Sequence, residues 1–94
     1  MEQRRPARPL ANDILTAVSV AYHRPVDLVP DRSSQPAFRA WVYLLRRAAN
    51  LRLKEVAGLA GISAPRVSQI QQESEQGEVD SVLEQLLAIY KLKI

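Results

Sequence analysis

The chain has 94 residues, 47% hydrophobic and 24% charged, which is typical of one globular domain with a modest core. It has no cysteine and no apolar run near the roughly 20 residues of a membrane span, so thiolate chemistry and membrane insertion are excluded and a cytoplasmic protein is expected. The net charge is +3, but residues 1–70 carry 11 Lys/Arg against 5 Asp/Glu and residues 71–94 carry 2 against 5, so a surface for a polyanion is expected only in the first part.

The chain begins with a basic segment that has no apolar period. Residues 1–10 are predicted to form a flexible arm or linker, and residues 11–94 the folded domain. Arg4, Arg5 and Arg8 make this arm either an inert tail or an extension that contacts the minor groove of DNA.

The first helix is predicted to start at Asn12, as its N-cap, and to stop before Pro25. A short turn over residues 25–29 and a loop over residues 30–34 should follow, because Pro, Asp and Ser dominate there.

A long second helix is predicted from a cap at Ser34, with Pro36 in its first turn, to a stop near Asn50. Its apolar positions are broad enough for a central helix that is contacted on two sides: Phe38, Trp41, Val42, Leu44, Leu45, Ala48 and Ala49. Arg39, Arg46 and Arg47 fall off this stripe, so the exposed face of the helix is expected to be basic.

Residues 53–72 have the spacing of a helix-turn-helix. Ala57 is small enough for two helices to cross closely, Gly61 permits a tight turn, and Ile62 fills the angle between the helices. Val67 and Ile70 should hold the second helix, which is predicted to run from an N-cap at Ser63 to about Glu75, against the core.

With Val67 and Ile70 buried, the opposite side of this second helix must face outward, and we expect it to contact base edges in the major groove. The predicted base-contacting residues are Ala64, Pro65, Arg66, Ser68, Gln69 and Gln72. Glutamine can bond adenine in bidentate fashion, and alanine or proline can touch a thymine methyl group. Arg66 could reach either guanine or a phosphate.

Phosphate contacts are expected from the elements that flank this helix. Ser63 and the first N–H groups of the helix form a natural phosphate site, because a helix N-terminus carries partial positive charge. The predicted phosphate or minor-groove residues are Ser63, Arg32, Arg39, Arg46, Arg47, Arg52 and Lys54.

The last helix is predicted to follow Gly77, with an apolar stripe and a basic end at Lys91 and Lys93. The stripe consists of Val79, Val82, Leu83, Leu86, Leu87 and Tyr90. It should pack on the same core, and the alternative is that it pairs two chains in a homodimer.

From Ile14 to about Gln72, roughly two thirds of the residues, the chain resembles the C-terminal DNA-binding domain of the bacterial replication initiator DnaA. It is more similar to the diverged copies of that domain attached to REP-associated transposases. The matching stretches are ILTAVSVAYHRPVDLV, the basic loop PDRSS, and AFRAWVYLLRRAANLRLKEVAGLAGIS.

This resemblance implies an all-α bundle of about five helices whose helix-turn-helix binds double-stranded DNA, with Arg32 in the adjacent minor groove. It also implies a transposase or replication protein as partner. Where the initiator opens its recognition helix with Asp-His-Thr-Thr, this chain has Ser63-Ala64-Pro65-Arg66 and one residue fewer in the turn.

Two other functions are weighed against this one. The segment APRVSQI is similar to the last region of flagellar-type sigma factors, which implies promoter DNA and RNA polymerase as partners. A helical protein-interaction module would need no basic face at all.

An enzyme is not expected, because the single histidine, His23, has no evident catalytic partner and Glu73, Glu75 and Glu78 are expected to form a solvated acidic face. No cofactor is expected.

Overall fold

The structure is a computed structural model that describes residues 10–33, 35–77 and 79–92. These residues form five helices and no strand, which confirms the expected all-α class for this part of the chain. The helices are α1 (Ala11–Tyr22), α2 (Ala37–Arg47), α3 (Leu53–Ala60), α4 (Ala64–Glu75) and α5 (Ser81–Ile89). Predictions for Arg4, Arg5, Arg8, Ser34, Glu78 and Lys93 lie outside the described residues.

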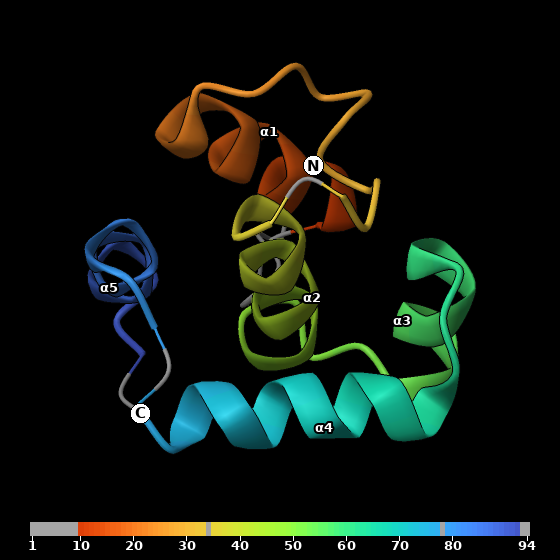
Figure 1. Cartoon of the computed structure of the whole chain (residues 1–94). Helices are drawn as coiled ribbons and strands as arrows, with labels where there is room; N and C mark the ends of the chain where they lie inside the picture. The colour runs from red at the N-terminus through yellow and green to blue at the C-terminus, as the bar shows by residue number, and fades with distance from the viewer. Residues whose placement is uncertain (1–9, 34, 78, 93–94) are drawn as a thin grey trace, which may run out of the picture.

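Helix α2 lies at the centre of the molecule, with the other helices arranged around it (Figure 1). It packs against α1, α3 and α4, so the predicted central helix with contacts on two sides is confirmed. The buried side chains include all seven predicted apolar positions of this helix and its end, together with Tyr43. Burial of these large side chains supplies the main driving force for folding.

Two predicted helix starts are corrected by the structure. Helix α1 begins at Ala11 rather than after Asn12, and Leu10 is its N-cap. The Asp13 carboxylate explains the difference, because it accepts a hydrogen bond from the Leu10 N–H at 3.3 Å. Helix α2 begins at Ala37, so Pro36 stands before the helix as its N-cap instead of in its first turn.

The segment between α1 and α2 is fixed by one buried residue and by local hydrogen bonds. Val29 is fully buried in the core. The Asp31 carboxylate accepts hydrogen bonds from the N–H and the hydroxyl of Ser33, both at 2.9 Å. Arg32 lies between these two residues with an exposed side chain.

Helix α5 uses its apolar stripe inside the same chain. Leu83, Leu86 and Leu87 are buried in the core, and the helix packs against α1. The Tyr22 hydroxyl also donates a hydrogen bond of 2.8 Å to Asp80, the N-cap of α5. The prediction that this stripe joins the core is therefore confirmed for these three leucines, and the pairing of two chains stays a prediction. Across the described ranges, no helix combines the length and apolar character needed to cross a bilayer.

Candidate nucleic-acid interface

Helices α3 and α4 are joined by three residues whose local geometry follows the sequence prediction. Gly61 ends α3 with a positive φ of 70°, in the left-handed region where glycine is favoured. Ser63 is the N-cap of α4, and its hydroxyl accepts a hydrogen bond of 3.3 Å from the Arg66 N–H. Ile62 and Ala57 are partly buried against the core.

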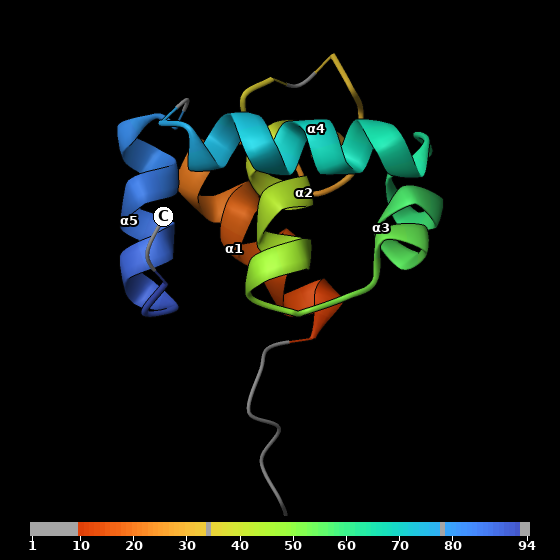
Figure 2. The same ribbon diagram turned by 90° about the horizontal axis from the view of Figure 1, so that it is seen from below.

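Helix α4 is attached to the molecule by one side. Val67, Ile70 and Ser74 are buried on the side that faces the core. The helix lies along one edge of the bundle in Figure 1, and in the view from below it crosses in front of α2 (Figure 2). Its outer side is therefore available over its whole length.

The predicted base-contacting residues are spread over this outer side and its two margins. Pro65, Gln69 and Gln72 are exposed, and Ala64, Arg66 and Ser68 are half-buried. All six thus lie outside the core, as the helical spacing predicted. They present hydroxyl, amide and small apolar groups and one guanidinium group, which can contact base edges.

Three predicted phosphate-contacting residues are exposed cations away from α4. Arg52 and Lys54 lie at the start of α3, which packs beside α4, and Arg32 lies in the loop before α2. Figure 1 shows this loop above α2 and α4 below it, so Arg32 lies at the other end of the central helix from α4. A duplex lying along α4 would have the cations at the start of α3 beside it.

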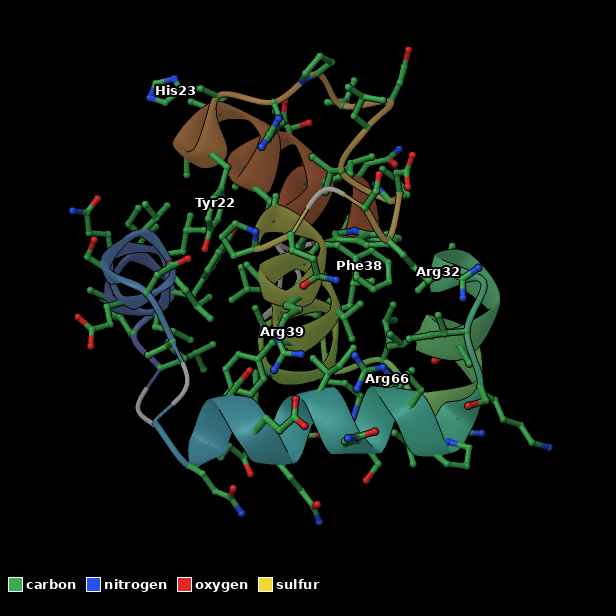
Figure 3. The ribbon with its side chains drawn as sticks, in the orientation of Figure 1. Tyr22, His23, Arg32, Phe38, Arg39 and Arg66 are labelled. Carbon is green, nitrogen blue, oxygen red and sulfur yellow. The ribbon has the colours of Figure 1, made fainter. Side chains whose placement is uncertain are left out.

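Arg39, Arg46 and Arg47 do not form the exposed basic face that the sequence predicted. All three are half-buried between α2 and α4 (Figure 3 shows Arg39). The Arg39 Nη2 donates to Glu73 Oε1 at 2.6 Å. The expectation of solvated arginines is wrong because α4 supplies acceptors for each of them.

Arg46 and Arg47 also bond to residues of α4 and to other parts of the chain. Arg46 donates to Gln71 Oε1 at 3.0 Å and to the Leu51 carbonyl oxygen at 2.8 Å. Arg47 donates to the Tyr43 hydroxyl at 2.7 Å and forms an ion pair of 3.4 Å with Glu75. These contacts position α4 on α2.

Glu73 is half-buried rather than part of the solvated acidic face expected from the sequence, whereas Glu75 is exposed as expected and pairs with Arg47. The hydrogen bond from Arg39 lowers the pKa of the Glu73 carboxyl below its usual 4.5, with a smaller contribution in the same direction from Gln69. Sequence reasoning missed the role of Gln71, Glu73 and Glu75. The sequence did contain a signal, because α2 has three arginines and α4 has three side chains, Gln71, Glu73 and Glu75, that can accept hydrogen bonds from them.

The site thus consists of a short helix, a tight turn and a second helix whose polar side faces outward, with exposed cations on neighbouring elements. Such an arrangement can bind a polyanion and place amide groups against its bases. Comparison of the chain with known protein families, curated proteins and solved structures found no match.

Proposed function

We propose that the chain binds double-stranded DNA in a sequence-specific manner, with α3 and α4 acting as a helix-turn-helix and α4 lying in the major groove. The observation that carries this proposal is the outer side of α4, where exposed Gln69 and Gln72 are held away from the core by buried Val67 and Ile70. An α-helix fits the major groove, and glutamine amides can pair with adenine there.

The geometry at the start of α4 supports a phosphate contact. Ser63 is exposed as the N-cap, and the first turn offers the Ala64 N–H, since Pro65 has no N–H and the Arg66 N–H donates to the Ser63 hydroxyl. The partial positive charge of a helix N-terminus favours an anion at this place. Arg52, Lys54 and Arg32 would then contact phosphates on either side, with Arg32 as the candidate for the minor groove.

Arg39, Arg46 and Arg47 have a different part in this proposal. Because their guanidinium groups bond to α4 or its neighbours, we assign them to holding the helix rather than to phosphate contacts. Arg66 is half-buried at the start of α4 and remains a candidate for either a base or a phosphate.

The finer proposal is that the domain resembles the C-terminal domain of DnaA and its copies attached to REP-associated transposases. Its order of a helix, a loop that carries Arg32, a helix and a closely joined helix pair supports this resemblance, although α2 has 11 residues and ends at Arg47 rather than near Asn50. The domain would then bring a transposase or replication protein to a DNA site. The opening of α4 differs from that of the initiator, so we expect a different target sequence.

The proposal is tested by selecting bound duplexes from a random DNA pool and measuring affinity for the selected sequence by fluorescence anisotropy. Gln69→Ala and Gln72→Ala should each lower discrimination at one or two base positions by roughly 5-fold to 150-fold, while affinity for unrelated DNA changes little. Gln85→Ala on α5, also an exposed glutamine, serves as the matched control and should change neither.

If the protein retains no duplex at low salt, DNA binding is excluded as its function. Retention on RNA polymerase instead would favour the sigma-like alternative. Binding of every duplex with equal affinity would leave a nonspecific DNA-binding protein and remove the assignment of Gln69 and Gln72.

A further inference from the structure

A chain of hydrogen bonds connects the central helix to an exposed glutamine on α4. The Arg39 Nη2 donates to Glu73 Oε1 at 2.6 Å, and the Gln69 Nε2 donates to Glu73 Oε2 at 3.1 Å. Each oxygen of the carboxylate thus serves one partner. Figure 3 shows Arg39 on α2, directed toward α4.

A second chain on the same two helices has a different outcome. Gln71 accepts from Arg46 through Oε1 at 3.0 Å and donates through Nε2 to Glu75 Oε2 at 3.3 Å. Both ends of its amide are therefore used inside the protein, and Gln71 is half-buried. Gln71 serves to hold the helices together and has little left for a ligand.

Gln69 uses one of the four hydrogen bonds that its amide can form. Its side chain is exposed, and among the described residues only Glu73 bonds to it, through one of the two N–H groups. The second N–H and the carbonyl oxygen are therefore left for a ligand. These two groups are the donor and acceptor that bidentate pairing with adenine requires.

The orientation of an exposed amide is normally not fixed, because a half-turn about its last bond exchanges oxygen and nitrogen. A carboxylate beside it changes this, since an ionised carboxylate can only accept hydrogen bonds. Glu73 therefore selects the orientation in which nitrogen faces it, and Arg39 keeps the carboxylate ionised and in place.

We propose that Glu73 and Arg39 are positioning residues that fix the amide of Gln69 in the one orientation that reads an adenine. This inference rests on the proposed DNA-binding function and deepens it. Fixing the amide before binding removes an ordering cost that would otherwise reduce discrimination. It also means that base preference at one position depends on a residue of α2 that need not touch DNA.

The chain offers a matched control for this role. Arg47 and Glu75 also join α2 to α4, with an ion pair of 3.4 Å, but the glutamine that Glu75 contacts is the internally bonded Gln71. If both pairs only held the helices together, removing either pair would have the same effect on base discrimination. If Glu73 positions Gln69, only removal of the Arg39–Glu73 pair should change discrimination.

The experiment measures affinities for the selected duplex and all its single-base variants, using the wild type, Gln69→Ala, Glu73→Ala, Arg39→Met and Glu75→Ala. Gln69→Ala should identify one base position at which discrimination between bases falls. At that position, discrimination should fall about fivefold or more in Glu73→Ala and by a smaller factor in Arg39→Met. Glu75→Ala should leave that position unchanged. The double variant Gln69→Ala/Glu73→Ala should lose no more than Gln69→Ala alone.

A second measurement needs no DNA and guards against effects of misfolding. The side-chain amide signals of Gln69 in an NMR spectrum of the free protein should shift in Glu73→Ala and in Glu73→Gln, and stay in place in Glu75→Ala. The positioning role is wrong if these signals do not move, or if Glu73→Ala weakens all duplexes equally. If Gln69→Ala changes no base position, or if the wild type binds no DNA, the proposed function itself fails and this inference fails with it.

Discussion

Two glycines three residues apart show how backbone conformation decides the effect of a single residue. Gly58 lies within α3, and Gly61 ends it with a φ of 70°. A Cβ atom added at either position would meet no heavy atom within 4 Å. Sterics with the rest of the protein therefore play no part, and only the local backbone geometry distinguishes the two sites.

Alanine at these two positions should change stability in opposite directions. Gly61→Ala should lower the free energy of unfolding by about 1 kcal/mol, because an L side chain is disfavoured in the left-handed region. Gly58→Ala should raise it by about 0.5–1 kcal/mol, because alanine favours the helix. Urea unfolding followed by circular dichroism measures both. Changes of the same sign would contradict this account of the turn.

The Glu73 carboxyl gives a second prediction for a single residue. Its pKa is lowered in the folded protein, mainly by the hydrogen bond from Arg39. The contribution of this pair to stability is therefore present above the unfolded value of 4.5 and is lost as the pH falls through the folded pKa. An NMR titration of the Glu73 side chain should show a midpoint below 4.5, and Arg39→Met should raise it. An unchanged midpoint in Arg39→Met would exclude Arg39 as the cause.

The helices differ in how far their sequences determined them. The turn between α3 and α4 and the bounds of α4 were predicted well, because Gly61 and Ser63 act through local backbone geometry that the sequence encodes directly. The start of α1 was missed because its capping group is Asp13, which lies inside the helix. The environment of the arginines on α2 was missed for another reason, since it depends on acceptors from α4, about 25 to 34 residues away.

Helices α1 and α5 give a prediction about contacts between elements. The Asp80 carboxylate oxygen Oδ1 accepts hydrogen bonds from both the Tyr22 hydroxyl and the Leu83 N–H, each at 2.8 Å. Tyr22→Phe removes the first bond and keeps the cap of α5. It should lower the free energy of unfolding by about 0.5–1.5 kcal/mol in a urea titration. Tyr90→Phe is the control, because Tyr90 is half-buried and its change should lower the free energy of unfolding by less than Tyr22→Phe does. Phe38→Tyr is unsuitable as a control because Phe38 is buried.

The same contact predicts how the protein responds to alkali. Burial, followed by the hydrogen bond to Asp80, raises the pKa of Tyr22 well above its usual 10.0. Ionisation of Tyr22 should therefore leave stability unchanged below pH 10.0 and lower it as the pH rises from 10.0 toward the folded pKa. Phenolate absorbance should appear at lower pH in urea than in the folded protein. Equal titration curves in the two states would refute this.

At the scale of the whole molecule, charge separates into a basic part and an acidic end, which makes the salt dependence of the proposed DNA binding predictable. The cations proposed for phosphate contact are Arg32, Arg52, Lys54 and Arg66. If each neutralises one phosphate, the slope of log K against log salt should be about −3.6. Lys54→Ala should make the slope shallower by about 1 and weaken all sequences together. Lys91→Ala, at the end of α5, is the control and should leave the slope unchanged.

If α4 lies in the major groove as proposed, its length limits how many base pairs one copy of the domain can contact. Its 12 residues extend over about 18 Å, which corresponds to roughly five base pairs of DNA. A sequence of about five base pairs occurs many times among the roughly 10⁶ or more positions of a genome. Binding at a unique genomic site would therefore require two such sites to be bound together, by a second copy of the domain or by a linked DNA-binding protein. The spacing between the two sites would then contribute to specificity.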